Sequence, residues 1–224
     1  MKVILKLLTL LMLSFSVSLT QAASNILDEQ LKSTRIIPKY ARGGCEYTQL
    51  SNNFVLLPLA PENAGITTTP QPSLYWFTSE DIGESLFTVK ITNIENENED
   101  PVEVVLEEDS LAAGIHIFSL QDHATTLAEN VLYEWTVSLV CDPYNPSSNQ
   151  TIGGVIKYQK DTALAEAVNS SAKQMANLYQ QKKVGWYDAV HAVSNQITTD
   201  PSLRTVRANL SKQEKLDAIA AFDN

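Results

Sequence analysis

The chain has 224 residues, of which 44% are hydrophobic and 19% charged, and 26 acidic against 16 basic side chains give a formal net charge of −10. This composition is typical of a globular protein and excludes a disordered chain, a collagen-like chain and a disulfide-rich scaffold. The acidic excess also argues against nucleic acid as a partner, because no basic surface is available to displace counterions from phosphates.

The N-terminal residues 1–23 have the features of a secretory signal peptide. Lys2 and Lys6 supply a positive region, an apolar run covers 7–17, and Ala23 offers a small residue near the cleavage point. A transmembrane anchor is the weaker interpretation, since about 20 apolar residues are needed to cross a bilayer and serines interrupt this run. We therefore expect an exported protein of the periplasm or the extracellular space, with no stable membrane anchor after cleavage.

Cys45 and Cys141 are the only two cysteines, and in an oxidising compartment they predict a disulfide. Such a bond closes a loop of roughly 100 residues and adds roughly 4 kcal/mol of stability in the chain-entropy model. The alternative is two free thiols, one of them a nucleophile. Two cysteines alone make a poor metal site, so no metal ligands are predicted.

After a polar linker or N-terminal arm at 24–44, residues 45–160 show the alternation of apolar and polar side chains that is typical of β-strands. The alternation is clearest from Val131 to Cys141. We expect strands at 54–59, 74–77, 87–91, 102–106, 115–120, 131–141 and 151–158. About seven short strands with one apolar face predict an antiparallel, immunoglobulin-like β-sandwich.

From residue 161 to 224 the period becomes helical, which predicts a C-terminal helical tail. We expect helices from Asp161 or Thr162 to Tyr179, from Trp186 to Ile197, from Asp200–Pro201 onward, and a last one capped by Ser211 and Glu214. A tail of this size has little core of its own, so it is predicted to pack on the sandwich or on a partner.

Several stretches, in this order and spacing, resemble a bacterial family of exported proteins catalogued as domain of unknown function 928. They are Arg42–Cys45, Gly65–Pro70, Tyr75–Phe77, Tyr133–Asp142 and, in the tail, Gly185–Ala189. One departure is Gly153–Val155, where a tryptophan is expected after the glycine, and it leaves the register of the last strand open. The resemblance implies a location in the cell envelope and no established activity.

The tail is also similar to one tetratricopeptide-type hairpin, in which Ala176 and Tyr179 would pack against Ala189 and Val193. Such repeats bury their faces by stacking, and at least three are normally needed. We therefore expect a single helix hairpin rather than a repeat array.

Three histidines are the candidates for acid–base chemistry. His116 shares a predicted strand face with Phe118, which favours a core or interfacial role, and His191 is expected to be solvated on a helix flank. His123 follows Asp122 in a turn, where it would be able to activate a serine nucleophile. No Gly-x-Ser-x-Gly elbow and no cofactor-binding motif is present, so neither a catalytic residue nor a cofactor is predicted.

An acidic loop between two predicted strands contains Glu95, Glu97, Glu99 and Asp100. Oxygen-rich loops of this kind can hold calcium, but the EF-hand spacing and its glycine are missing, so a solvated hairpin loop is the simpler interpretation. Residues 80–134 hold 14 acidic side chains and one basic one, so one side of the sandwich should carry a negative field that favours cationic partners.

Tyr75, Trp76 and Phe77 are consecutive aromatic residues that cannot all face one core from a single strand. Either one of them points outward, where it would stack on a sugar or anchor a partner, or the strand is covered on both faces. Covering by the C-terminal helices is the favoured interpretation.

We therefore expect a non-enzymatic protein of the cell envelope that engages another envelope protein through its helical tail. The alternative is a carbohydrate- or calcium-binding module that uses the aromatic residues or the acidic loop. A second alternative is a hydrolase that uses His123 or His116.

Overall fold

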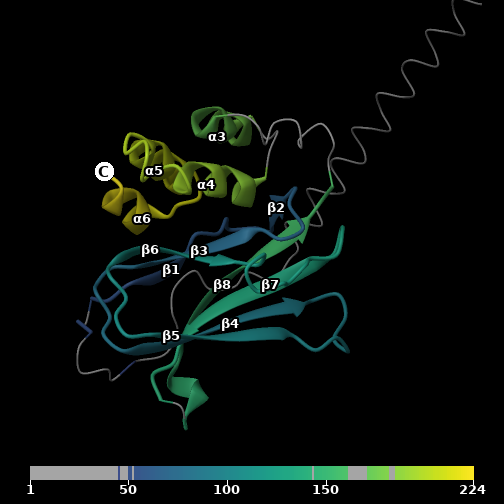
Figure 1. Cartoon of the computed structure of the whole chain (residues 1–224), viewed down its shortest axis with the longest axis vertical. Coiled ribbons are helices and arrows are strands. Elements are labelled where there is room, and N and C mark those ends of the chain that lie inside the picture. The colour runs from purple at the N-terminus through teal and green to yellow at the C-terminus, as the bar shows by residue number, and fades with distance from the viewer. Residues whose placement is uncertain (1–44, 46–49, 52, 143, 161–170, 182–184) are drawn as a thin grey trace, which may run out of the picture. The chain divides into compact units, whose positions relative to one another are not determined.

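The computed structural model describes residues 45, 50–51, 53–142, 144–160, 171–181 and 185–224, all within one compact unit, 36–224 (Figure 1). The predicted signal peptide, the predicted arm and the predicted helix start at Asp161 or Thr162 lie outside the described residues. Where the structure is described, none of its helices has the length and apolar character needed to span a membrane.

The described residues form two β-sheets and a group of C-terminal helices, which confirms the mixed architecture predicted from the sequence. The smaller sheet has the strand order β1–β3–β6, formed by Leu56–Pro58, Ser73–Thr78 and Gly114–Ser119. The larger sheet has the order β2–β8–β7–β4–β5, formed by Gly65–Thr67, Gln150–Tyr158, Leu132–Leu139, Ser85–Asn93 and Val102–Glu108. All neighbours are antiparallel except β2 and β8, which run parallel, so the expectation of a purely antiparallel sandwich is wrong at β2.

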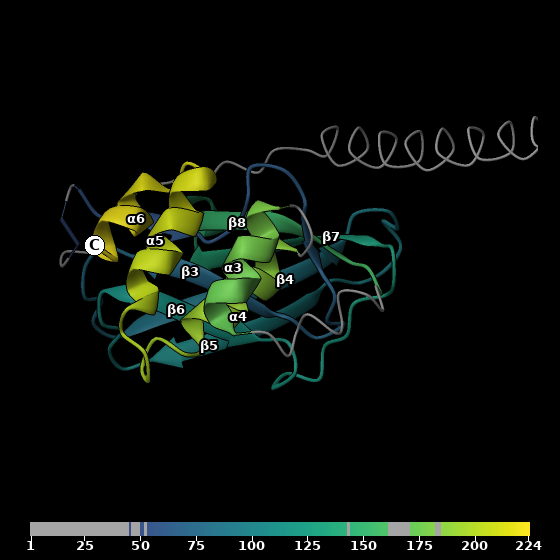
Figure 2. The ribbon, with the colours of Figure 1, turned by 90° about the horizontal axis from the view of Figure 1, so that it is seen from above.

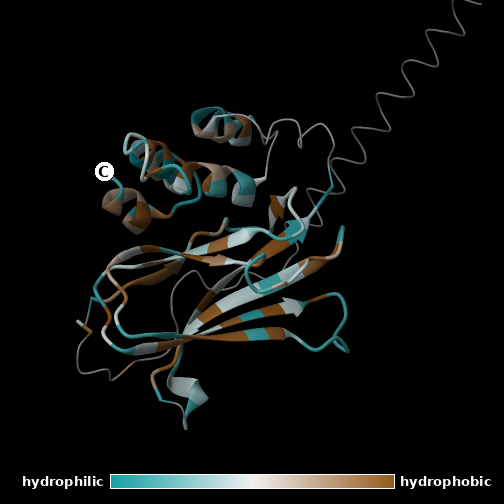
Figure 3. Ribbon diagram, in the orientation of Figure 1, coloured by the Kyte–Doolittle hydropathy of each residue, from teal (hydrophilic) through white to brown (hydrophobic). Residues whose placement is uncertain are grey.

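Strand β7 shows how the sequence pattern produces the sandwich. Its residues alternate between buried and half-buried positions, and Trp135 and Val137 are fully buried. Hydrophobic and hydrophilic positions alternate along the strands of the larger sheet (Figure 3). Trp135 lies opposite Gly154 of β8, which defines the register that the sequence left open. Side chains along a strand alternate with a period of two, so a shift of one residue would move Trp135 and Val137 to the opposite face of the sheet. Their burial therefore requires the observed register.

The smaller sheet is covered on both faces. All six residues of β3 are buried, unlike those of a strand with one solvated face. Trp76 packs against Phe87 of the larger sheet, with ring centroids 6.1 Å apart. On the other face Tyr75 contacts His191 and Phe77 contacts Phe222, both from the helical tail. The interpretation that helices cover this strand is therefore confirmed.

The tail consists of α3 (Ala172–Gln180), α4 (Trp186–Ser194), α5 (Leu203–Gln213) and α6 (Asp217–Phe222), which lie over the smaller sheet (Figures 1 and 2). The predicted capping box is wrong, because α5 continues through Ser211 and α6 begins only at Asp217. Buried Leu210 and Ser211 keep this turn of α5 in the interior. The helix ends at Gln213, and the positive φ of Lys215, 58°, lets the amide of Leu216 bond to the Ser211 carbonyl at 2.9 Å.

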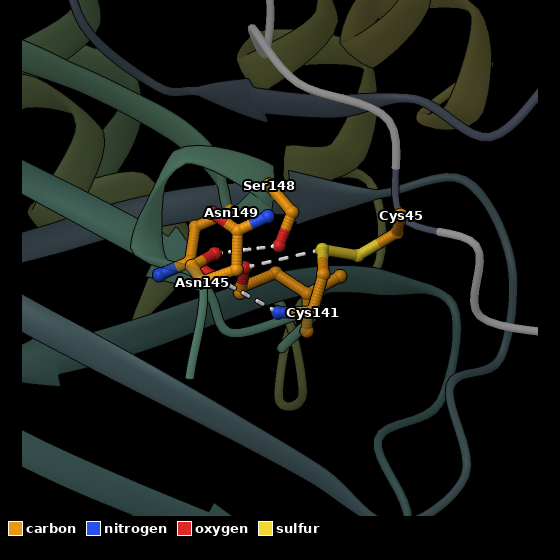
Figure 4. Close-up of a disulfide and its surroundings, with 6 residues drawn as sticks. Cys45, Cys141, Asn145, Ser148 and Asn149 are labelled. Atoms are coloured by element: carbon orange, nitrogen blue, oxygen red, sulfur yellow. Dashed lines mark hydrogen bonds between the residues drawn. A yellow bond between two sulfur atoms is a disulfide. The ribbon is translucent and has the colours of Figure 1, made fainter. Parts of the chain in front are cut away.

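The predicted disulfide joins Cys45 to Cys141, with their Cα atoms 5.1 Å apart (Figure 4). Cys141 follows the end of β7, and its amide donates to the side-chain oxygen of Asn149 at 3.1 Å. Asn145 lies beside this pair and accepts a hydrogen bond from the hydroxyl of Ser148 at 2.8 Å (Figure 4). The disulfide therefore links the first described residue covalently to the end of β7 in the larger sheet.

Candidate functional site

The first turn of α4 inserts the Tyr187 ring into the larger sheet. Two glycines make room for it: a Cβ atom on Gly65 would lie 2.6 Å from the ring, and one on Gly154 would lie 3.1 Å from its hydroxyl. The indole N–H of Trp135 donates to the Tyr187 hydroxyl at 2.7 Å, and that hydroxyl donates to the Val155 carbonyl at 3.2 Å. Burial raises the pKa of Tyr187, so the phenol stays neutral.

The two residues before Tyr187 contact the backbone just after β1 and in β2. The indole N–H of Trp186 donates to the Leu59 carbonyl at 2.9 Å. Gly185 passes so close to β2 that a Cβ atom there would lie 2.0 Å from the carbonyl oxygen of Ile66. No residue other than glycine fits between α4 and β2 at this position.

Asp188 continues the junction one residue further along α4. One of its carboxylate oxygens accepts from the Thr67 hydroxyl at 2.7 Å, and the other accepts from the Thr68 amide and hydroxyl at 2.9 and 3.0 Å. Burial raises the pKa of Asp188, and these hydrogen bonds oppose the rise in part. The Asp188 carboxylate therefore holds α4 to the C-terminal end of β2 through three hydrogen bonds.

His191 lies one turn after Asp188 and contacts the smaller sheet. Its Nδ1 atom is hydrogen-bonded to the Tyr75 hydroxyl at 2.9 Å, so the expectation of a solvated histidine is wrong. Burial lowers the pKa of His191, while the nearby Asp188 carboxylate acts in the opposite direction. Burial also raises the pKa of Tyr75 to about 12, against smaller opposing effects of Ser73 and Arg207.

A buried ion pair lies in the tail near Tyr75. The Arg207 guanidinium donates to both carboxylate oxygens of Asp223 at 2.7 Å and to the Ser194 hydroxyl at 3.2 Å. The Arg207 side chain is 7% exposed and that of Asp223 is fully buried. This two-pronged pair connects α4, α5 and the end of α6.

These groups form a joint between the tail and both sheets, which we call the helix–sheet joint: Thr67, Thr68, Tyr75, Trp135, Gly154, Gly185, Trp186, Tyr187, Asp188 and His191. Four of the stretches that carry the family resemblance meet here, although they lie far apart in the sequence. The donors and acceptors described above are satisfied within the protein. The arrangement positions helices, and the phenols at its centre are too weakly acidic to exchange protons near neutral pH.

The aromatic residues predicted as candidates for ligand binding are all interior. Tyr75, Trp76 and Phe77 are between 3% and 4% exposed, so the outward-pointing alternative is wrong. The physical reason is that the tail covers one face of β3 and the larger sheet covers the other. A sugar ring has no open face of these side chains on which to stack.

The acidic loop joins β4 to β5 and is exposed. Asn93 organises it, since its amide nitrogen donates to Glu99 at 2.7 Å and its oxygen accepts from the Glu95 amide at 3.0 Å. Glu97 and Asp100 are exposed in the same loop. Over the part of the chain that the structure describes, no three histidine, cysteine or acidic side chains are grouped so as to hold a metal ion.

The two histidines considered for hydrolysis lie on or next to β6. His116 Nε2 is hydrogen-bonded to the Thr78 hydroxyl at 2.8 Å, and burial lowers the pKa of His116 to about 4. Thr78 is completely buried, so a substrate cannot reach that hydroxyl. His123 stacks on the ring of Phe118 at a centroid distance of 4.3 Å.

Sequence reasoning missed the polar residues of the joint. Asp188 and His191 are three residues apart on one helix, a spacing that places them on the same face and was a usable signal. Thr67 belongs to a strand of only three residues, which is too short to show a period. The nearby ion pair also gave no signal, because a charged residue such as Arg207 on a short helix, or Asp223 at a helix end, is typical of a solvated surface.

The sequence profile of a family described as Domain of Unknown Function (DUF928) matches residues 38–222. No curated protein matches the chain. Among solved structures, the chain is similar to the crystal structure of a family 76 glycoside hydrolase from a bovine Bacteroides thetaiotaomicron strain, at 12% identity and a TM-score of 0.28, covering 52% of this chain and 22% of that one. It is also similar to Astrotactin-2, a conserved vertebrate-specific and perforin-like membrane protein, at 13% identity and a TM-score of 0.27, covering 80% and 36% of the two chains. The two matches span only 22% and 36% of those structures' chains, and likenesses at such TM-scores carry no argument about fold or activity.

Proposed function

The chain belongs to the family Domain of Unknown Function (DUF928), and from this premise we propose that it is an exported, non-enzymatic protein of the cell envelope that engages another protein through its helical tail. We include in this proposal the immunoglobulin-like character of the sandwich. The observation that carries it is the helix–sheet joint, which uses the buried polar groups of α4 to hold the tail in one position.

The tail presents a defined surface away from the sheets. The exposed residues of α3 and α5, which we call the outer face of the tail, are Lys173, Gln174, Asn177, Gln180, Arg204, Thr205, Asn209, Lys212 and Gln213. Three of them are cations and none is acidic, in a chain whose net charge is −10. A rigid surface loses little conformational entropy on binding, and its charge favours an acidic partner.

The burial of the aromatic residues and of Thr78 argues against a carbohydrate-binding module and against a hydrolase. A carbohydrate site would need an aromatic face, and the predicted aromatic residues are buried. A hydrolase would need an accessible nucleophile beside a histidine, and the hydroxyl nearest to His116 is that of the buried Thr78.

Photo-crosslinking in the envelope tests this function. A photoreactive amino acid at Lys212, on the outer face of the tail, should produce a covalent adduct with one partner, and the same group at Tyr144, which is 96% exposed on the β7–β8 connection, should not. The triple variant Lys173→Glu, Arg204→Glu and Lys212→Glu should abolish the adduct. Adducts of equal yield at both positions, or none at Lys212, would contradict the role of the tail. Deleting the tail is not a usable test, because it would uncover Tyr75 and Phe77.

A further inference from the structure

Strand β5 is the last strand of the larger sheet on one side. It pairs with β4 along its whole length, from Val102 to Glu108, and among the described residues β4 is its only partner strand. It lies at the margin of the larger sheet, away from the tail helices (Figures 1 and 2). The backbone donors and acceptors that point away from β4, which we call the outer edge of β5, are therefore available to another strand.

The side chains of β5 divide between the two faces of the sheet. Val102, Val104 and Leu106 lie opposite buried residues of β4 and share the inner face with them. Because side chains alternate along a strand, Glu103, Val105 and Glu107 lie together on the outer face of the larger sheet. All three of these are exposed, Val105 to 54%. The outer face of β5 is thus a row of an acidic, an apolar and a second acidic side chain.

Most of the features that protect natural edge strands from other strands are missing from β5. Such edges usually carry a β-bulge, a proline or a charge that points inward from the middle of the strand. The pairing of β5 with β4 is continuous, so it contains no bulge, and β5 contains no proline. The one charge with an inward position is at the last residue, Glu108, which is exposed. The protection that remains is the negative charge of Glu103 and Glu107.

This negative charge acts against pairing with a second copy of the chain. Antiparallel pairing of two β5 strands about Val105 would set Glu103 of one copy opposite Glu107 of the other, and like charges that are directly opposite destabilise a sheet. Further exposed acidic residues adjoin the two ends of β5: Glu99, Asp100 and Asp109. The same charges attract a strand that carries lysine or arginine. The charge of this edge therefore favours a basic segment of a different protein.

The pairing of β4 with β5 shows which pattern such a segment needs. Lys90 of β4 lies directly opposite Glu103 on the outer face of the larger sheet. Residues that lie opposite each other in neighbouring strands point to the same face. A strand added at the outer edge of β5 would therefore set one row of its side chains beside Glu103, Val105 and Glu107. Lysine or arginine beside each glutamate would repeat the pairing of Lys90 with Glu103 on the other side of β5.

We propose that the outer edge of β5 binds an extended segment of another protein, in which lysine or arginine alternates with apolar residues, as a sixth strand of the larger sheet. Backbone hydrogen bonds to β5 hold the segment in place. Its basic side chains lie beside Glu103 and Glu107 on the outer face, and its apolar side chains continue the inner face next to Val104. This surface is separate from the outer face of the tail, so it stands or fails independently of the function proposed above.

Binding of synthetic peptides to the full chain tests the proposal. The probe is a fluorescent peptide of about nine residues, a typical strand length, in which lysine and valine alternate. The control peptide has the same composition and charge, but its lysines and valines form two blocks. We expect the control to bind at least about tenfold more weakly, and the probe to slow hydrogen exchange in Val102–Glu108. Equal binding of the two peptides, no binding of the probe, or slowed exchange only elsewhere in the chain would overturn the proposal.

Two N-methylated forms of the probe test for backbone pairing. Successive amides of a strand point to opposite sides, so the lysine amides and the valine amides face opposite edges of the peptide, and only one set faces β5. One form is methylated on its lysine amides and the other on its valine amides. One of the two forms should bind at least about tenfold more weakly than the other. Equal affinities of the two forms would show that the peptide does not pair with a strand edge.

Neutralising single carboxylates separates the outer edge of β5 from the overall charge of the protein. Glu103→Gln with Glu107→Gln removes both proposed charge pairs and should weaken binding of the probe about fivefold. The matched variant Glu129→Gln with Asp217→Asn makes the same change at exposed positions outside β5 and should weaken binding less than about twofold. Equal weakening by both variants would show attraction to net charge alone and would overturn the assigned site.

Discussion

The indole N–H of Trp135 donates a 2.7 Å hydrogen bond to the Tyr187 hydroxyl, although the two residues are 52 positions apart. One comes from the centre of the larger sheet and the other from the first turn of α4. This bond shows that the tail is part of the same core as the sandwich.

Tyr187→Phe removes the acceptor of the Trp135 indole and the donor to the Val155 carbonyl. A buried donor without a partner costs about 1–3 kcal/mol, so we expect the free energy of unfolding in urea to fall by about this amount. Tyr144→Phe is the matched control at a 96% exposed side chain and should change the stability by less than about 0.5 kcal/mol. Equal stability of both variants would mean that the Tyr187 hydroxyl does not anchor the tail.

Asp223→Ala leaves the Arg207 guanidinium buried without its carboxylate. We expect a loss of about 3–5 kcal/mol in the free energy of unfolding, because an unpaired buried charge is strongly destabilising. The double variant Arg207→Met with Asp223→Leu removes both charges and should recover most of this loss. A double variant as unstable as the single one would show that packing, rather than charge, decides the stability at this position.

His116 makes the stability depend on pH between about 4 and 6.5. Its pKa is about 4 in the folded protein and 6.5 in an unfolded chain, so the unfolded state binds more protons within this window. The contribution to stability is complete above pH 6.5 and is lost as the pH falls to about 4. The pKa difference corresponds to at most about 3 kcal/mol, and solvent screening of the half-buried ring reduces this to about 1–2 kcal/mol.

Urea unfolding of the wild type and of His116→Gln at pH 8 and pH 4.5 measures this effect. The wild type should lose about 1–2 kcal/mol more than the variant over this interval. Parallel loss in both proteins would assign the pH dependence to other groups.

Reduction of the Cys45–Cys141 disulfide should lower the stability without changing the fold. The bond joins residues 96 positions apart and restricts the unfolded chain. Without it the unfolded chain gains conformational entropy, so the free energy of unfolding should fall by about 2–4 kcal/mol. Unfolding of the double variant Cys45→Ser with Cys141→Ser measures the loss. Mass spectrometry after alkylation without reductant provides the control, since neither sulfur of the wild type should react.

Much of the fold could be predicted from local patterns. The alternation in β7 located the inner face of the larger sheet, and the change to a helical period at the C-terminus located α3, α4 and α5. The disulfide followed from the presence of two cysteines in a chain that begins with the pattern of an exported protein. These features depend on the local periodicity of the side chains and on the redox chemistry of cysteine, and both can be inferred from the sequence without knowledge of distant contacts.

The site depended on contacts that no local pattern contains. Strand β2 is three residues long and pairs parallel to β8, so it has neither a period nor a hairpin turn to indicate it. Ser211 and Glu214 matched a capping box, but burial of Ser211 extended α5 through it.

The sequence by itself determined the strands of the sandwich, the helical tail and the covalent link, because these follow from periodicity and composition. Only the tertiary structure decided that Tyr75 and Phe77 lie beneath the tail, that Asp188 binds the end of β2 and that Arg207 pairs with Asp223. Each of these depends on which segments meet across the core, and that choice is made by packing between residues far apart in the chain.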